Sequence, residues 1–425
     1  MEYDNKEVRM NTQPKHFKVN TFNKNLFFAV SHLTIMGLLI GQHAVANDNW
    51  KLTLKNAYIE RDNTALEDTG SWSQGISLFY NSDYQPTPID NLEIGLDASV
   101  QYAVRLSNDK HVADTILPFD VQTQSQADDF LKYGGTLKLK YNDTVLKVGE
   151  LWLDLPVTSV DASRQLLASY LGANVQSKIN DRLTLEAGRV TKVSPRNQEG
   201  FKKFSFTANG VKHESDGLNY LDLRYKFNDH LKAEYYFGNL ENLFNKHYIG
   251  LDHQLKLNED LSLFSKFKYF NAQDSGSNLD INSQNIGLLE TVKYNNHSFG
   301  AGYQKIVGDA YPLPDGFLPE LYFINWNATG FFKEKEQSYH FIYAYNFKDY
   351  VPGLNTTVKY SYGDHIKMAN GQENKESEFN FIGNYSFQQE SLKGVGLQYL
   401  FSKYDVDHGN DFTENRVFLT YTKKF

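Results

Sequence analysis

The sequence predicts an all-β protein, a transmembrane antiparallel β-barrel of about 18 strands. Two observations lead to this prediction. Apolar and polar residues alternate along nearly the whole chain after Asn47, and tight polar turns alternate with long connections. A third observation is the aromatic residue Phe425, which ends the chain on the apolar face of an alternating segment. The mean hydropathy of −0.54 is too low for a bundle of membrane helices.

Composition excludes several other classes of protein. Aromatic residues make up 15% of the 425-residue chain, which is too many for an intrinsically disordered acidic chain. The absence of Cys excludes disulfide scaffolds, Cys-zinc sites and thiol nucleophiles. A formal net charge of −8, with basic residues scattered along the chain, is unfavourable for nucleic-acid binding.

An apolar run near the N-terminus departs from the hydrophilic average. It reads LFFAVSHLTIMGLLIG from Leu26 to Gly41, follows three lysines and precedes Ala44-Val45-Ala46. This combination predicts a secretion signal at residues 1–46, followed by a barrel domain at 47–425. The alternative is a membrane anchor, but the run is shorter than the ~20 residues of a helical span. Met1 and Met10 are both possible translation starts.

Segments of about ten residues with one apolar face are the predicted strands. In the last of them, Val417 and Leu419 share a face with Phe425, whereas Arg416 and Thr420 lie on the other face. An even number of strands brings both termini to the same end of a closed antiparallel barrel. Eighteen strands are predicted, at residues 50–61, 71–83, 92–106, 132–141, 144–150, 171–178, 181–191, 217–227, 230–238, 247–257, 260–271, 284–294, 296–306, 337–347, 353–362, 374–388, 393–404 and 413–425.

The connections between these strands are unequal in length. Short polar turns such as Asn142-Asp143 and Asn295-Asn296 alternate with long connections, as in outer-membrane barrels. A secreted β-sandwich or propeller would also alternate, but no blade-like repeat is visible and the turn lengths are asymmetric. The terminal Phe425 resembles the residue that the outer-membrane insertion machinery reads. The long connections are predicted at residues 107–130, 151–170, 192–216, 272–283, 307–336 and 363–373.

Several segments, in order over the chain after residue 46, together match one pattern. They are WSQG at 72–75, LKVGE at 146–150, Pro156, SRQL at 163–166, LTLEAGR at 183–189, LEN at 240–242, GYQK at 302–305, PGL at 352–354, and Glu414 with Arg416. Together they resemble the OprD-type (Occ) substrate-specific porins of the outer membrane. The resemblance implies an eighteen-stranded monomeric barrel in the outer membrane, without a cofactor, whose third and seventh loops fold inward to narrow the pore.

The same resemblance implies a line of basic residues that guides the carboxylate of a small solute, faced by acidic loop residues. A narrow channel with low-dielectric walls focuses such a field, and rings of charge select solutes by sign. The alternative for each basic residue is a role without solute contact, either at the barrel end beside the lipid headgroups or on a solvated part of the lumen wall. The candidate pore-lining residues are Lys55, Arg61, Arg105, Lys147, Arg164, Lys266, Lys268, Lys359 and Arg416, and the candidate acidic residues are Asp161, Asp309 and Asp315.

The sequence also departs from the family pattern. Ile342 stands where the family commonly places an inward arginine. Gln398 and Leu400 occupy the strand that in the family usually contributes two arginines, so the basic line is thinner here. The first hypothesis is passive diffusion of small carboxylate-bearing solutes, namely aromatic acids or amino acids. The alternative is a porin for neutral sugars or chito-oligosaccharides with an aromatic-lined lumen. A barrel for adhesion or catalysis is a third hypothesis. However, the sequence contains no G-x-S-x-G nucleophile elbow, no H-E-x-x-H zinc motif, no P-loop and no Asp-rich calcium loop.

Overall fold

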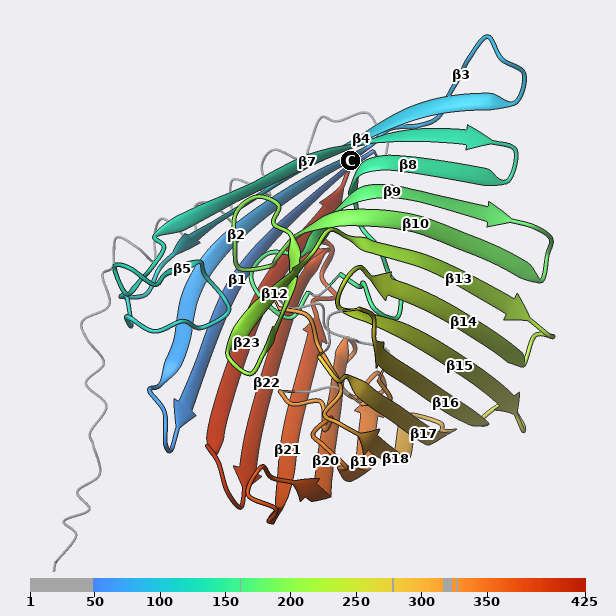
Figure 1. Cartoon of the computed structure of the whole chain (residues 1–425). Coiled ribbons are helices and arrows are strands. Elements are labelled where there is room, and N and C mark those ends of the chain that lie inside the picture. The colour runs from blue at the N-terminus through green and yellow to red at the C-terminus, as the bar shows by residue number, and fades with distance from the viewer. Residues whose placement is uncertain (1–48, 161, 277–278, 316–322, 326–327) are drawn as a thin grey trace, which may run out of the picture. The chain divides into compact units, whose positions relative to one another are not determined.

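The computed structural model describes residues 49–425, except 161, 277–278, 316–322 and 326–327 (Figure 1). The predicted secretion signal at residues 1–46 lies outside the described residues. Within the described part of the chain, no helix combines the length and the apolar composition that crossing a bilayer requires.

Eighteen long strands form one closed antiparallel barrel in the described part of the chain, as predicted. Each strand pairs with the next one along the chain, so the barrel is a simple meander. Short strands and one 3-10 helix decorate the connections: β3 (Gln85–Pro86), β5 (Phe119–Asp120), β6 (Ser125–Gln126), β11 (Phe204–Ala208), β12 (Val211–Ser215) and η2 (Glu390–Leu392). The barrel strands are β1 (Trp50–Asn63), β2 (Thr69–Asn81), β4 (Leu92–Arg105), β7 (Asp129–Tyr141), β8 (Thr144–Leu151), β9 (Ser169–Lys178), β10 (Leu183–Ser194), β13 (Leu218–Lys226), β14 (Leu231–Leu240), β15 (Phe244–Lys256), β16 (Leu261–Asp274), β17 (Asn282–Tyr294), β18 (His297–Gly308), β19 (Gln337–Asn346), β20 (Leu354–Lys367), β21 (Glu373–Ser386), β22 (Val395–Val406) and β23 (Phe412–Lys424).

The first and last strands close the barrel. β1 pairs with β23 along its whole length, from Lys51 opposite Lys424 to Asn63 opposite Phe412. Trp50 and Phe425 complete this seam, because Trp50 N–H donates to the Phe425 carbonyl at 2.9 Å and Phe425 N–H donates to the Trp50 carbonyl at 3.0 Å. Closure leaves no sheet edge with unpaired backbone groups, which a bilayer would not tolerate.

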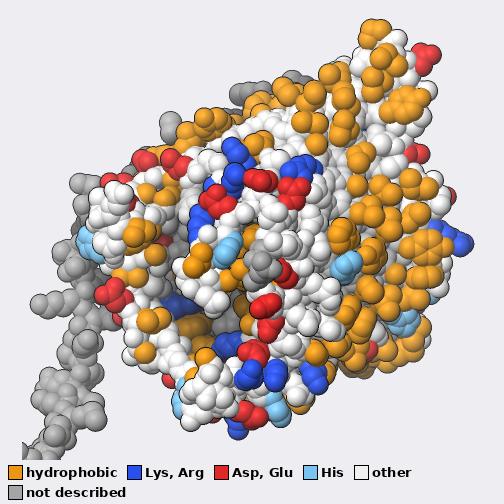
Figure 2. Space-filling view, viewed as in Figure 1, with side chains coloured by type: hydrophobic (Ala, Val, Ile, Leu, Met, Phe, Trp, Pro, Cys, Tyr) orange, Lys and Arg blue, Asp and Glu red, His pale blue; other side chains and the backbone are white. Residues whose placement is uncertain are grey.

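The alternation in sequence becomes the two faces of the barrel wall. On β23, Leu419 is 39% exposed, whereas its neighbour Phe418 is 5% exposed and Arg416 only 4% exposed. The exposed apolar residues therefore face lipid, and the other set faces the lumen. Figure 2 shows the hydrophobic side chains spread over the outside of the strands.

Tight turns occupy one end of the barrel. Asn142 and Asn295 begin two-residue turns with φ near +50°, the left-handed conformation that asparagine tolerates better than most residues. The long connections lie at the other end. Trp50 and Phe425, where the barrel begins and ends, lie at the end with the tight turns. An even number of strands brings them to the same end.

Several predicted strands are too short at the end of the long connections, and two of these, β10 and β20, contain register shifts. β10 continues to Ser194 where residues 181–191 were predicted, and β20 continues to Lys367 where 353–362 were predicted. Both extensions contain a register shift, between Val190 and Lys192 in one case and after Gly363 in the other. A β-bulge inserts one residue and so interrupts the period-two pattern from which the strands were read.

The hydrophobic core lies inside the barrel, between the wall and the inward-folded loops. One cluster joins Ile59 and Phe418 of the wall to Ile116, Leu117 and Leu166 of two loops. A larger cluster packs loop residues such as Leu155 and Tyr311 against the walls of β13 to β16. The predicted inward folding of long loops is therefore confirmed.

We expect the two faces of β23 to respond in opposite ways to the same substitution. Leu419→Arg places a charge against lipid near mid-strand and should cost about 2–4 kcal/mol of folding free energy. Thr420→Arg is the matched control, because its side chain lines a cavity in the lumen. The measurement is urea unfolding in lipid vesicles. Equal loss of stability in both variants would contradict the assignment of faces.

Candidate functional site

The third loop (residues 152–168) folds into the lumen and is held there by the wall of β1 and β2. Lys55 Nζ donates to the Ala162 carbonyl at 2.8 Å and to the Arg164 carbonyl. Gln165 binds both strands, because it accepts from Ser73 Oγ at 2.8 Å and donates to the Lys55 carbonyl at 3.0 Å. The candidate residue Lys55 therefore faces the lumen and anchors the loop.

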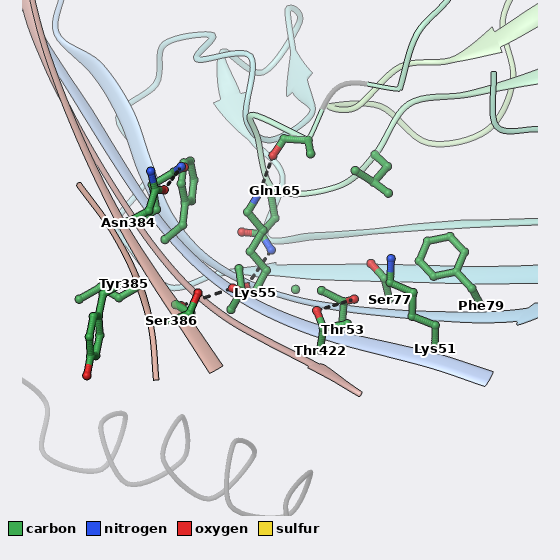
Figure 3. A pocket seen from close by; sticks show the side chains of 18 residues that line it. Lys51, Thr53, Lys55, Ser77, Phe79, Gln165, Asn384, Tyr385, Ser386 and Thr422 are labelled. Carbon is green, nitrogen blue, oxygen red and sulfur yellow. Dashed lines mark hydrogen bonds between the residues drawn. The ribbon is translucent and has the colours of Figure 1, made fainter. Parts of the chain in front are cut away.

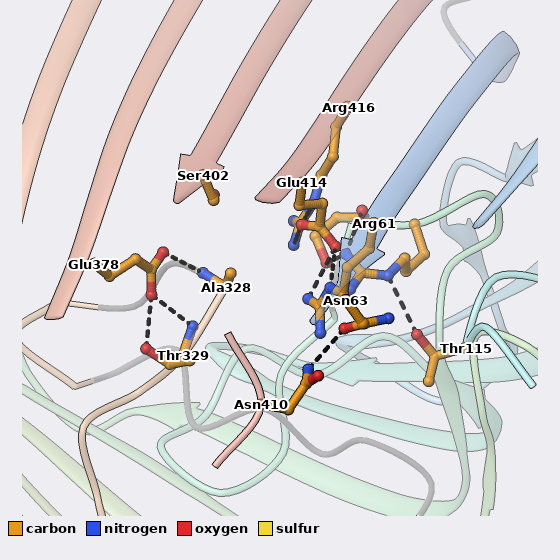
Figure 4. Close-up of polar contacts among 12 residues, drawn as sticks. Arg61, Asn63, Thr115, Ala328, Thr329, Glu378, Ser402, Asn410, Glu414 and Arg416 are labelled. Atoms are coloured by element: carbon orange, nitrogen blue, oxygen red, sulfur yellow. Dashed lines mark hydrogen bonds and ion pairs between the residues drawn. The ribbon is translucent and has the colours of Figure 1, made fainter. Parts of the chain in front are cut away.

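The seventh loop (residues 309–336) is held from other strands. Lys246 Nζ on β15 donates to the Pro312 carbonyl at 2.7 Å. On β21, the Glu378 carboxylate accepts from the backbone of Ala328 and Thr329, each at 3.0 Å, and from Thr329 Oγ1 at 2.6 Å (Figure 4). Both loops thus narrow the lumen, and the face seen in Figure 2 is hollowed.

Four arginines gather around one carboxylate at this constriction. Arg61 of β1 pairs with Glu414 of β23 at 2.9 Å, and Arg416 pairs with the same carboxylate (Figure 4). Arg164 of the third loop approaches Thr115 Oγ1 at 3.5 Å and its own neighbour Ser163. Arg196 follows β10 in the chain. We call Arg61, Arg164, Arg196 and Arg416 the arginine cluster.

The two loop arginines, Arg164 and Arg196, are buried and share one hydrogen-bond acceptor. Arg164 is 8% exposed and Arg196 is 3% exposed, and both donate to Ser163 Oγ, at 3.4 and 3.0 Å. Burial lowers the pKa of each guanidinium to about 9, and the positive charge of Arg416 contributes to both shifts. Positive charge is therefore crowded at the constriction, which favours the entry of an anion.

The sequence missed Arg196. It lies within the predicted long connection 192–216, but nothing in the local pattern says that this connection enters the lumen. The alternation would have placed Glu414 on the lumen face together with Arg416. It would likewise have placed Glu376 and Glu378 there, beside the residues that bind the seventh loop. The predicted pore lining contained only basic residues on the barrel wall, so it did not include Glu376, Glu378 or Glu414.

The other basic candidates are distributed around the lumen. Lys268 on β16 pairs with Asp252 at 3.1 Å, and Lys266 lies exposed on the same face. Lys359 on β20 donates to Asn325 of the seventh loop at 3.1 Å. Lys147 on β8 lines a cavity of about 390 Å³ between side chains of β7 to β10 and the start of the third loop. These residues are separate from the arginine cluster.

Arg105 and the acidic candidates have local partners. Arg105 ends β4 and binds the second loop through the Ala127 carbonyl at 3.2 Å and the Asp128 carboxylate. Asp309 accepts from Asn282 N–H at 3.0 Å near the start of β17. Asp315 accepts from Ser205 Oγ at 2.9 Å, which joins the seventh loop to the hairpin of β11 and β12. Asp161 lies outside the described residues.

A cavity of about 410 Å³ lies between the third loop and the lumen faces of five strands (Figure 3). Among its lining residues only Lys51 and Lys55 carry charge. The remainder are mostly hydroxyl, amide, small and aromatic side chains. Gln398 on β22 is one of the amides. The lining residues are Lys51, Thr53, Lys55, Gly75, Ser77, Phe79, Ala162, Gln165, Leu167, Asn384, Tyr385, Ser386, Gly396, Leu397, Gln398, Phe418, Thr420 and Thr422.

Comparison with known proteins agrees with this geometry. The family model for outer membrane porins of the OprD family matches residues 44–425. The chain belongs to the OprD family. OprD porins are channels and not enzymes, and they reside in the outer membrane. Their long loops are extracellular and their short turns periplasmic.

Individual OprD relatives cover nearly the whole chain. Porin-like protein GalP of Pseudomonas putida is 27% identical over 390 residues, which are 87% of this chain and 90% of GalP. The crystal structure of Acinetobacter baumannii OccAB4 is 66% identical, with a TM-score of 0.87 over 88% of this chain and 98% of OccAB4. The crystal structure of Pseudomonas aeruginosa OpdK with vanillate is 26% identical, with a TM-score of 0.81 over 88% of this chain and 98% of OpdK.

We expect Glu414 to set the charge balance of this OprD porin. Glu414→Gln removes the carboxylate that pairs with Arg61 and Arg416, so the constriction becomes more positive and more selective for anions. The reversal potential in a salt gradient should move toward the anion equilibrium potential. Glu390→Gln, an exposed carboxylate in a periplasmic turn, is the control with the same charge change. Equal reversal potentials in the two variants would contradict this expectation.

The seventh loop should depend on pH through Glu336. Its carboxyl is buried against Glu376, with Lys333 and Tyr404 also facing this pair, and burial followed by the Glu376 charge raises its pKa from 4.5 to about 9. Because the folded state favours the protonated form, this contribution to stability is complete below pH 4.5 and is lost as pH rises toward 9. Conductance fluctuations of single channels should therefore grow from pH 5 to pH 9. Glu336→Gln should make them independent of pH over this range, and an unchanged pH dependence would refute the assignment.

Proposed function

We propose that this porin allows passive, selective diffusion of small carboxylate-bearing solutes, such as aromatic acids or amino acids. The observation that carries the proposal is the arginine cluster at the constriction, where Arg61 and Arg416 pair with Glu414 and the buried Arg164 and Arg196 lie nearby. A guanidinium presents two parallel N–H donors to a carboxylate, which gives geometric selectivity as well as attraction.

Other cations extend the path in this proposal. Lys55, Lys147, Lys266, Lys268 and Lys359 are lumen-facing residues at which a solute carboxylate pauses weakly between the two mouths of the pore. Many weak sites favour passage because a solute that binds too tightly does not leave. Arg105 acts at the extracellular rim, and Asp309 and Asp315 contribute negative charge on the seventh loop.

The OpdK structure supports the choice of solute. It contains vanillate, an aromatic carboxylate, and its fold matches this chain over 98% of OpdK. The aromatic ring of such a solute can also contact aromatic side chains of this porin, since Phe418 and Phe79 line the cavity beneath the third loop. The proposal includes export through the signal at residues 1–46, membrane insertion through Phe425 and a monomeric channel without cofactor, metal or nucleic-acid partner.

A neutral sugar or chito-oligosaccharide is the second candidate solute. The cavity of about 410 Å³ favours it, because hydroxyl and amide side chains there lie next to aromatic rings. Gln398 contributes a neutral side chain on the strand that in the family usually carries two arginines. This reading predicts weak ion selectivity and slow passage of sugars.

The deciding experiment is single-channel recording in a planar bilayer, with benzoate, arginine and chito-oligosaccharide added in turn. We expect benzoate to permeate or block, and Arg164→Gln to weaken that interaction about tenfold, equivalent to ~1.4 kcal/mol. Arg182→Gln, an equal loss of charge in the periplasmic turn 179–182, is the control.

The other outcomes separate the hypotheses. Block by the sugar alone, with equal benzoate currents in the Arg164 and Arg182 variants, would favour the second candidate. Folded protein without any conductance would overturn both candidates.

A further inference from the structure

One lysine of the wall binds two loops at once. Lys132 lies on β7, is 3% exposed and points into the barrel. Its ammonium donates to the carbonyls of Leu167 at 2.5 Å, Pro195 at 2.8 Å and Ser194 at 3.1 Å. An ammonium has three N–H donors, so this arrangement uses its whole donor capacity on backbone carbonyls.

The three carbonyls belong to two different loops. Leu167 lies at the end of the third loop, two residues before β9 begins. Ser194 ends β10, and Pro195 opens the fourth loop (residues 195–217). Carbonyls buried without a donor are costly, so the two loop segments depend on the same ammonium.

A second wall residue strengthens the hold on the third loop. Gln101 on β4 is the register partner of Lys132 and is also buried. It accepts from Leu167 N–H at 3.0 Å, and its amide approaches the Leu167 carbonyl at 3.4 Å. Leu167 is therefore fixed from both its N–H and its carbonyl. Lys132 also joins the third loop to the fourth, beside the contact of Arg196 with Ser163.

The two loop segments carry two members of the arginine cluster. Arg164 stands three residues before Leu167, and Arg196 directly follows Pro195. Both guanidiniums donate to the same hydroxyl, Ser163 Oγ. A displacement of either loop segment would separate the two charges and change the field at the constriction.

We propose that Lys132 is a positioning residue for solute selection, which clamps the third and fourth loops together so that Arg164 and Arg196 form one anion-attracting surface. It does this without contact with the solute, because its side chain is buried behind the loops. The solute part of this inference rests on the proposed function, whereas the clamp itself does not.

Trypsin provides a direct test, because it cleaves after arginine and both arginines are buried in the native protein. In full-length protein folded in vesicles, Lys132→Met should increase cleavage after Arg164 and after Arg196 about tenfold, since cleavage follows the population of opened loops. Lys140→Met is the matched control. It removes the same charge from the same face of β7, but Lys140 pairs with Glu93 near the periplasmic turn.

Single-channel recording gives the functional consequence. Lys132→Met should show larger current fluctuations and a smaller preference for benzoate over chloride than Lys140→Met. Increased cleavage with unchanged benzoate preference would support the clamp and count against the proposed solute. Unchanged cleavage at both arginines, or cleavage at only one, would overturn the clamp whatever the solute is.

A folding check accompanies both measurements. The heat-dependent shift in electrophoretic mobility reports whether the barrel has formed. If Lys132→Met fails this check, Lys132→Gln replaces it, since the amide keeps two N–H donors. The glutamine variant should show the same pattern of cleavage with a smaller increase, and wild-type cleavage rates in it would overturn the proposal.

Discussion

The rest of the structure depends on one constraint, the need to pair every backbone N–H and C=O inside a membrane. The seam between β1 and β23 satisfies it, because it turns an open sheet into a closed one. Closure then dictates the alternation of side chains, the position of both termini at one end, and a lumen that the long loops enter. The chemistry of the pore is thus a consequence of where closure leaves room for polar groups.

Loops inside a lumen bring backbone carbonyls with them, and these also need donors. Lysines of the wall supply several: Lys55 for the third loop, Lys132 for the third and fourth, and Lys246 for the seventh. The arginines of the cluster bind carboxylate and hydroxyl groups at the constriction. The division agrees with their shapes, because a compact ammonium suits converging carbonyls and a planar guanidinium suits a carboxylate.

The sequence predicted the barrel well because each strand alternates between side chains that face lipid and side chains that face the lumen. The same alternation placed Lys55, Lys268 and Arg416 on the inner face. The predicted strands ended too early at the β-bulges after Val190 and Gly363, where one extra residue reverses the alternation. It carried no information on the loops, whose positions depend on contacts between residues far apart in sequence. Arg196 was missed, and the contact of Asp315 with Ser205 was unforeseen, for that reason.

The pairing of the first and last barrel strands has a consequence for biogenesis. Since β1 pairs with β23 as well as with β2, the first barrel strand lacks its second neighbour until the last barrel strand is available. Until then the growing sheet has two open edges, each able to pair with a wrong strand or another chain. Truncation by even a few C-terminal residues would therefore trap an unsealed intermediate, and any factor that assists assembly must shield the β1 edge until translocation is complete.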